Sequence, residues 1–137
     1  MEINKNLQVS PNFQLWEFVQ GKAIDSSHYE AFWASLGHPE IEKIYVLAGW
    51  LQAVRDHYAK PVIITNSFRP VWYEKSRNRS GKSQHVTGGA ADFYVQDIPL
   101  KQVYSDWEPR WAGGFAINNT QGFIHADVRG YKARWEY

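Results

Sequence analysis

The sequence predicts an α+β fold, a single domain over residues 1–137 in which helices pack on a central, mostly antiparallel sheet. Apolar residues recur at helical spacing after Pro39. Beyond Pro61 this period gives way to short β-branched and apolar runs separated by turn residues. Helices followed by strands are typical of the α+β class. A chain of 137 residues is one ordinary domain, and 44% hydrophobic with 21% charged residues indicates a globular protein.

The helices are expected mainly in the first half of the chain. Asn12 can cap a short helix over residues 13–19, and a second apolar segment begins after Asp25 and ends at Gly37. The longest helix carries a row of apolar side chains that should face the sheet, namely Ile41, Ile44, Tyr45, Ala48, Leu51, Val54 and Tyr58. A short helix is also expected over residues 99–104.

Strands are expected in the second half, over residues 62–65, 90–95, 115–117 and 123–128. The last two are separated by a five-residue turn that contains glycine, Asn118 to Gly122, and should form a hairpin. The segment from Asn66 to Ser83 is polar and is expected to be irregular.

Composition excludes several classes of protein. The net charge of +1, from 15 Lys and Arg against 14 Asp and Glu, argues against a general nucleic-acid binder. No apolar run approaches the ~20 residues that a membrane-spanning helix needs. The chain has no cysteine. Disulfides and thiolate ligands are therefore excluded, and a metal site must use histidine and carboxylate.

Two short segments carry the candidate chemistry. His85 precedes a predicted strand and Asp92 lies on it, where a carboxylate is costly to bury unless it is paired or bound to a metal. On a later strand His125 and Asp127 are two residues apart, so they point to the same face. Two imidazoles and one carboxylate suit Zn²⁺ with an open position for water, and a further carboxylate can act as general base. Spacing alone leaves open that these residues are structural.

A resemblance to a known family carries the interpretation further. Ser83-x-His85-x-x-Gly88-x-Ala90-x-Asp92 resembles the ligand motif of the zinc D-Ala-D-Ala carboxypeptidases and the phage L-alanyl-D-glutamate endopeptidases. The run from Phe123 to Gly130, and the segments Asn66 to Pro70 and Asn12 to Phe18, are similar to a small branch of the same superfamily, which includes the hedgehog amino-terminal domain at greater distance. The resemblance implies an α+β fold, one Zn²⁺ per chain on His85, Asp92 and His125, and a peptidoglycan peptide as substrate.

The same resemblance suggests roles for other residues. The carboxypeptidase branch places a glutamate base three residues before the last histidine, but that position is Gly122 here. Asp127 is then the candidate base, with the alternative that it orients a ligand imidazole. Arg69 is expected to bind a substrate or transition-state carbonyl, with a salt bridge to a surface carboxylate as the alternative. Ser83 and Gln84 are also predicted to bind substrate, although Ser83 could equally cap its loop.

Other features have competing interpretations. Trp72, Tyr73, Trp107 and Trp111 lie in or beside segments expected to be irregular, where they could line a groove, but core packing is the commoner use of such residues. The basic run from Lys75 to Lys82 could meet anionic groups of a cell wall, but a solvated loop is favoured. The remaining histidines, His28, His38 and His57, are expected at the surface.

The predicted function is a zinc peptidase of the cell wall, from a phage or a bacterium. The alternatives are a catalytically inactive zinc-binding module of the same fold and, less favoured, a nucleic-acid-associated protein. The segment Met1 to Ser10 lacks the apolar stretch of a secretory signal. We therefore expect a cytoplasmic, monomeric protein without a membrane segment, which reaches the wall after lysis, by holin release or as part of a virion.

Overall fold

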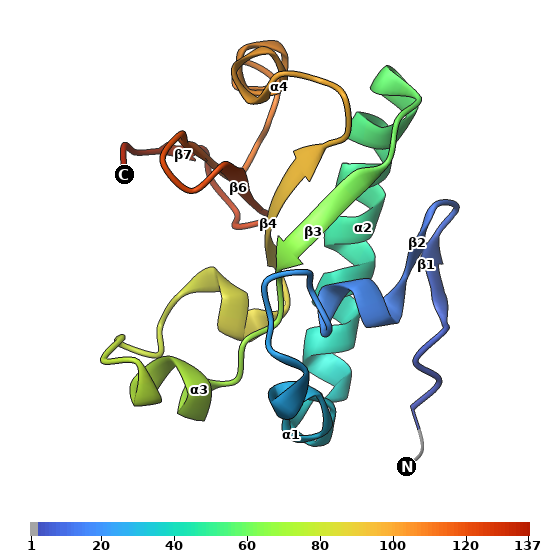
Figure 1. Cartoon of the computed structure of the whole chain (residues 1–137), viewed down its shortest axis with the longest axis vertical. Coiled ribbons are helices and arrows are strands. Elements are labelled where there is room, and N and C mark those ends of the chain that lie inside the picture. The colour runs from blue at the N-terminus through green and yellow to red at the C-terminus, as the bar shows by residue number, and fades with distance from the viewer. Residues whose placement is uncertain (1–2) are drawn as a thin grey trace.

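A five-stranded sheet and one long helix organise the computed structural model, which describes residues 3–137 (Figure 1). The sheet has the strand order β3-β4-β6-β5-β7. Its strands are β3 (Val62–Asn66), β4 (Ala90–Val95), β5 (Gly114–Asn118), β6 (Phe123–Asp127) and β7 (Ala133–Arg134). All neighbouring pairs are antiparallel except β5 and β7, which are parallel. The predicted α+β fold with a mostly antiparallel sheet is confirmed.

The long helix α2 (His38–Tyr58) runs beside β3 and β4 (Figure 1). The side chains along one face of this helix are buried. It begins with the backbone N–H of Gly37 donating to the Glu40 carboxylate at 3.0 Å. It ends at Ala59, which adopts a left-handed conformation. The predicted apolar row is largely confirmed, with its buried members being Ile44, Ala48, Leu51 and Val54, and Leu47, outside the predicted row, is buried as well. Tyr45 is 42% exposed and lies outside the buried face.

Shorter helices follow the predictions in part. The helices α1 (Tyr29–Ser35) and α4 (Leu100–Trp107) lie where short helices are expected. Asp25 caps the 3-10 turn η2 (Ser26–His28) by accepting from the Ser27 N–H at 2.8 Å.

The helix predicted over residues 13–19 is wrong. Residues Phe13–Gln14 form strand β2, which pairs with β1 (Gln8–Ser10), and only Leu15–Phe18 continue as the 3-10 helix η1. Asn12 does not cap it, because its side-chain oxygen accepts instead from Gln52 Nε2 at 2.7 Å. Gln52 Oε1 also accepts from the Asn12 N–H at 2.9 Å, so a tertiary contact with α2 overrides the local cap.

The segment from Asn66 to Ser83 contains a helix that the sequence pattern hid, α3 (Val71–Ser76). Its buried face is made by Tyr73 and Glu74. The Tyr73 ring packs on Phe32 of α1 with ring centroids 4.9 Å apart. Because one of the two buried residues is a carboxylate, the segment shows no apolar period.

Residues 3–137 include no helix that is both long enough and apolar enough to cross a bilayer. Met1 and Glu2, the first residues of the segment inspected for a signal sequence, lie outside the described residues.

Candidate metal centre

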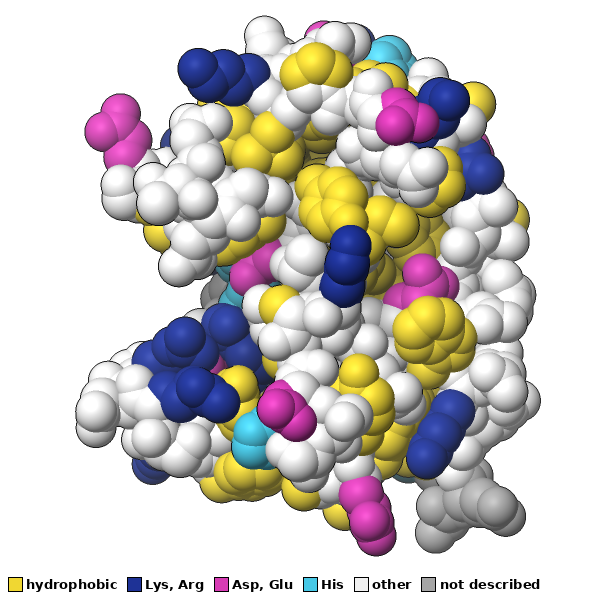
Figure 2. All heavy atoms as spheres, in the orientation of Figure 1, with side chains coloured by type: hydrophobic (Ala, Val, Ile, Leu, Met, Phe, Trp, Pro, Cys, Tyr) yellow, Lys and Arg dark blue, Asp and Glu magenta, His cyan; other side chains and the backbone are white. Residues whose placement is uncertain are grey.

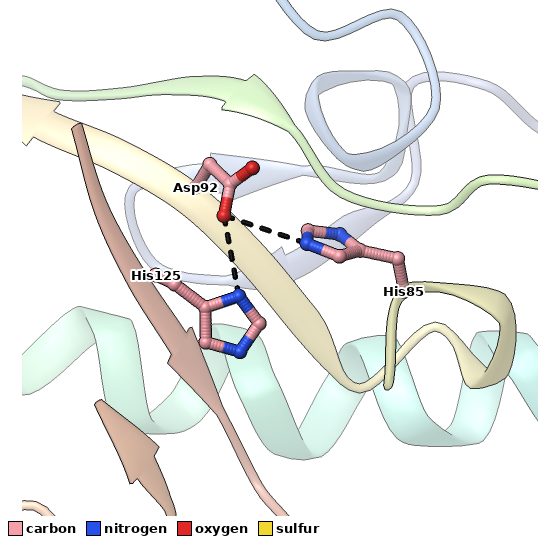
Figure 3. A group of neighbouring side chains, drawn as sticks. All are labelled: His85, Asp92 and His125. Atoms are coloured by element: carbon pink, nitrogen blue, oxygen red, sulfur yellow. Dashed lines mark ion pairs between the residues drawn. The ribbon is translucent and has the colours of Figure 1, made fainter. Parts of the chain in front are cut away.

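Three buried side chains meet at one end of the sheet (Figure 3). Asp92 on β4 and His125 on β6 are direct partners in the antiparallel register. His85 comes from the 3-10 helix η3 (Gln84–Thr87), which lies just before β4. At the end of this turn Gly88 has a φ of 83°, and a Cβ there would press against the backbone of Glu40. The glycine therefore lets η3 pack on α2 and fixes where His85 stands.

The spacing of the three side chains fits one bound ion. Asp92 Oδ1 lies 3.4 Å from His85 Nε2 and 3.3 Å from His125 Nδ1 (Figure 3). With metal–ligand bonds of about 2.0–2.1 Å, a tetrahedral zinc site separates its ligand atoms by roughly 3.3–3.4 Å. All three candidate ligand atoms lie within 4.8 Å of one another.

The hydrogen bonds of the two imidazoles indicate which nitrogens are free to bind a metal. His85 Nδ1 lies 2.8 Å from the Ser67 carbonyl, which can only accept, so we assign the proton to Nδ1. His125 Nε2 lies 2.7 Å from Asp127 Oδ2, and the same reasoning assigns the proton to Nε2. The lone pairs of His85 Nε2 and His125 Nδ1 then face Asp92 Oδ1, which is buried without a hydrogen-bond donor among residues 3–137. Three lone pairs that point at one another repel unless a cation lies between them.

The electrostatics of the cluster favour positive charge at this point. Burial opposes ionisation of Asp92, but the two histidines outweigh it and hold the pKa of its carboxyl well below its usual range. Burial likewise opposes protonation of His125, but Asp127 and Asp92 outweigh it and raise the imidazole pKa. Protons and metal ions therefore compete for the same site.

Asp127 is completely buried, and hydrogen bonds from Gly114, Arg129 and His125 engage both of its carboxylate oxygens. Its Oδ1 accepts from the Gly114 N–H at 2.8 Å and from Arg129 Nε at 2.8 Å. Its Oδ2 accepts from Arg129 Nη2 at 2.7 Å and from His125 Nε2, the ring nitrogen opposite the metal-facing one. A Cβ on Gly114 would collide with this carboxylate. The geometry thus favours the alternative, that Asp127 orients His125. The general-base role stays a prediction.

The three candidate ligands, His85, Asp92 and His125, line a cleft of about 600 Å³. Figure 2 shows the hollow at the left edge of the molecule, with Lys and Arg side chains along its lower side. One wall is cationic and comes from the segment between β3 and β4, namely Arg69, Arg79 and Lys82. The other wall is aromatic and comes from β6 and the residues after it, namely Phe123, Tyr131, Trp135 and Tyr137.

The predicted substrate-binding residues all line this cleft. Arg69, Ser83 and Gln84 are among its lining residues, so the structure brings them together with the metal ligands. Arg69 Nε lies 3.4 Å from Glu74 Oε2, and Ser83 Oγ donates to Glu74 Oε1 at 2.7 Å. Glu74 is fully buried, so the partner of Arg69 is not the surface carboxylate considered from the sequence. The roles of Ser83 and Gln84 in substrate binding stay predictions.

The aromatic candidates from the sequence do not line the cleft. Tyr73, Trp107 and Trp111 are buried in the core. Trp72 is 46% exposed and donates its indole N–H to Ser35 Oγ on α1.

The aromatic residues that do line the cleft lie on β6 or follow it, and Trp135 packs on a candidate ligand. Its ring centroid lies 5.0 Å from that of the ligand His125. It is fixed there by the adjacent Arg134, whose guanidinium donates to four backbone carbonyls, those of Glu108, Trp111, Gly113 and Ala133. An arginine followed by an aromatic residue was visible in the sequence, but nothing there indicated the parallel pairing of β7 with β5.

The structure thus defines an α+β domain with a buried His–Asp–His set that could hold a metal ion and that borders a polar cleft. Among known protein families, residues 30–127 match peptidase M15. The chain belongs to this family, whose members are zinc-dependent metallopeptidases. The family resemblance inferred from the motifs is confirmed. No curated protein matches the chain.

Proposed function

We propose that the protein is a zinc-dependent peptidase that hydrolyses a peptide bond in the stem or cross-link peptides of peptidoglycan, with one zinc ion held by His85, Asp92 and His125. The observation that carries the proposal is the convergence of three lone pairs beside an open cleft, with Asp92 Oδ1 unpaired. Zinc supplies a Lewis acid that polarises the peptide carbonyl and lowers the pKa of a bound water to about 7.

The chain's own residues position the substrate and the ligands. Arg69 lines the cleft with a side chain only 13% exposed, and its guanidinium suits a substrate carbonyl or carboxylate. Ser83 and Gln84 stand beside it and can contact the peptide backbone. Asp127 keeps His125 in the tautomer whose Nδ1 faces the metal site. We propose this positioning role for Asp127 in place of the general base.

A second candidate function is a zinc-binding module of the same fold without catalysis. One observation favours it. Among the described residues that line the cleft, Asp92 is the sole carboxylate, and it is a proposed ligand. The position of the glutamate base in related enzymes is Gly122 here. Proton transfer would then depend on groups other than a dedicated glutamate.

Digestion of purified sacculi separates the two functions. We expect zinc-loaded protein to generate new peptide ends, detected by mass spectrometry of the muropeptides, and a chelator to prevent this. The matched control is the double variant His85→Ala, His125→Ala. Full zinc loading without any new peptide end would support the inactive module, and zinc-independent cleavage would contradict the metal centre. The monomeric state, the cellular location and the phage or bacterial origin stay predictions.

A further inference from the structure

The basic segment between Lys75 and Lys82 divides into two pairs of cations in the structure. Arg79 and Lys82 line the metal cleft. The other pair does not line it. The guanidinium of Arg77 lies over the Tyr73 ring, 4.4 Å from its centroid, and the aliphatic chain of Lys75 packs beside Gly81. The sequence alone favoured a solvated loop for all four, but two of them have a defined place beside the proposed catalytic site.

The cleft-facing pair is built on a buried anchor, Glu74 of α3. Its side chain is completely buried, and its Oε2 accepts from Arg79 Nη1 at 2.8 Å. The same oxygen lies 3.4 Å from Arg69 Nε, while Oε1 accepts from Ser83 Oγ. Burial opposes ionisation of Glu74, but Arg79, Ser83 and Arg69 outweigh it and lower its pKa, so it is a carboxylate. One negative charge therefore orders two guanidinium groups and a hydroxyl along one wall.

This wall carries more positive charge than its one buried acid, Glu74, can balance. Arg69 and Arg79 share the single charge of Glu74. The Lys82 ammonium has no ion-pair partner within residues 3–137, since the ion pairs found there do not include it. Across the cleft, Arg129 is already paired with Asp127. The donors of Arg79 and Lys82 are thus available for a ligand with the charge of a carboxylate.

We propose that Arg79 and Lys82, held by Glu74, form a subsite that binds a free carboxylate of the peptide, separate from the metal ligands and from Arg69. The inference rests on the proposed function for the kind of ligand, a wall peptide. A guanidinium fixed at one nitrogen has less side-chain entropy to lose when a carboxylate binds it, and its remaining donors match the two carboxylate oxygens. The subsite therefore selects peptides that carry an acid, and rejects those in which that acid is an amide.

The test uses zinc-loaded protein and three probes. These are the stem pentapeptide L-Ala-γ-D-Glu-L-Lys-D-Ala-D-Ala, the same peptide with the D-Glu α-carboxyl amidated, and the same peptide with the carboxyl terminus amidated. Affinity is measured as the calorimetric Kd, or as KM where cleavage occurs, so the subsite is tested whether or not the protein is an active peptidase. The two double variants are R79Q/K82Q and its matched control K75Q/R77Q, which removes the same charge from the same segment.

We expect wild-type protein to prefer the free acid over one of the two amides by roughly 10- to 100-fold, the range of charge-assisted hydrogen bonds. R79Q/K82Q should lose this preference while still binding about one zinc per chain, and K75Q/R77Q should keep it. The amide that is discriminated identifies which carboxylate the subsite binds. Equal affinity of wild-type protein for all three probes, or an equal loss in both double variants, would overturn the proposal.

Discussion

Two fully buried carboxylates, Asp127 and Glu74, each pair with arginine side chains that line the cleft, but they serve different parts of the site. Asp127 lies on β6, within the sheet, and its second partner is the ligand His125. Glu74 lies on α3 and its other partners, Arg69 and Ser83, line the cleft without being metal ligands. The same kind of ion pair between acid and arginine therefore adjoins a candidate metal ligand in one case and the residues of the cationic wall in the other. The difference indicates that the role of such an ion pair depends on what the carboxylate binds besides its arginine.

We expect the largest effect from removing the proposed metal ligands, because both walls of the cleft surround the metal site. The double variant His85→Ala, His125→Ala should lower zinc content from about one ion per chain to nearly none, because a single remaining carboxylate cannot hold a zinc ion. Elemental analysis of protein purified without added metal measures this. Full stoichiometry in the double variant would mean that the ion is bound elsewhere.

Asp127→Asn tests the metal side of the comparison. The amide keeps the shape of the side chain but weakens its hold on His125 Nε2, so zinc affinity should fall by roughly 10- to 100-fold. Activity should return when zinc is added. Competition with a chromophoric chelator gives the affinity, and Glu74→Gln serves as the control that leaves it unchanged. If turnover instead falls by roughly 10²–10⁴-fold at saturating zinc, Asp127 is the general base after all.

Glu74→Gln tests the substrate side. Loss of the charge that orders Arg79 should raise KM for the free-acid pentapeptide by about 10-fold, within the range for hydrogen bonds to charged groups, and should leave zinc affinity intact. Circular dichroism checks that the variant is folded. Asp127→Asn at saturating zinc is the matched comparison, and its KM should stay near that of the wild type. A shift in zinc affinity alone would place Glu74 with the metal centre instead.

Gly114→Ala sharpens the comparison by displacing one carboxylate sterically. A Cβ there would collide with the Asp127 carboxylate, so we expect the free energy of unfolding to fall by about 1–3 kcal/mol, as overpacked interiors do. Gly49→Ala on α2 is the control, because a Cβ there meets no atom within 4 Å. Replacing a helical glycine by alanine should stabilise by about 0.5–1 kcal/mol. Urea denaturation of both variants measures whether the free energy of unfolding falls or rises in each. Equal destabilisation would count against the predicted collision.

The smallest expected effect concerns how stability depends on pH, because the slope should have opposite signs in the metal-free and the zinc-loaded protein. The pKa of His125 is raised in the metal-free fold, so its contribution to stability is present below the ordinary histidine pKa and is lost as pH rises through the raised value. In the zinc-loaded protein the ligand must be deprotonated, so stability is lost as pH falls. Thermal unfolding of both forms between about pH 5 and 8 compares the two slopes. Parallel slopes would contradict competition between protons and metal.

Local spacing together with the family resemblance predicted the candidate metal ligands. His125 and Asp92 lie on strands whose period of two fixes the face of each side chain. The role of Asp127 needed more than this rule. The two residues do share a face, but only the structure shows that Asp127 binds the ring nitrogen opposite the metal-facing one. The orientation of an imidazole is set by tertiary contacts, which residue spacing does not contain.

The aromatic wall and the burial of Glu74 were missed because they depend on the tertiary packing of segments without a clear sequence pattern. Glu74 is fully buried beside Arg69, Arg79 and Ser83, and a carboxylate within a basic, polar segment gives no sign of burial in the sequence. The aromatic wall depends on β7, a two-residue strand without any period to detect. The α2 row and the four longer strands were predictable because each contains a local run of apolar or β-branched residues.

The docking of β7 has a consequence for how such a site can diversify. The match to the peptidase family ends at residue 127, where β6 also ends, whereas Tyr131, Trp135 and Tyr137 follow it. These aromatic residues belong to a short edge segment attached through Arg134 to backbone carbonyls, which any sequence at those positions offers. Substitutions in this segment can therefore alter which peptides fit without disturbing the strands that carry the ligands. The fold thus places the candidate metal ligands and the aromatic wall on different segments, so that the wall can change while the strands with the ligands stay the same.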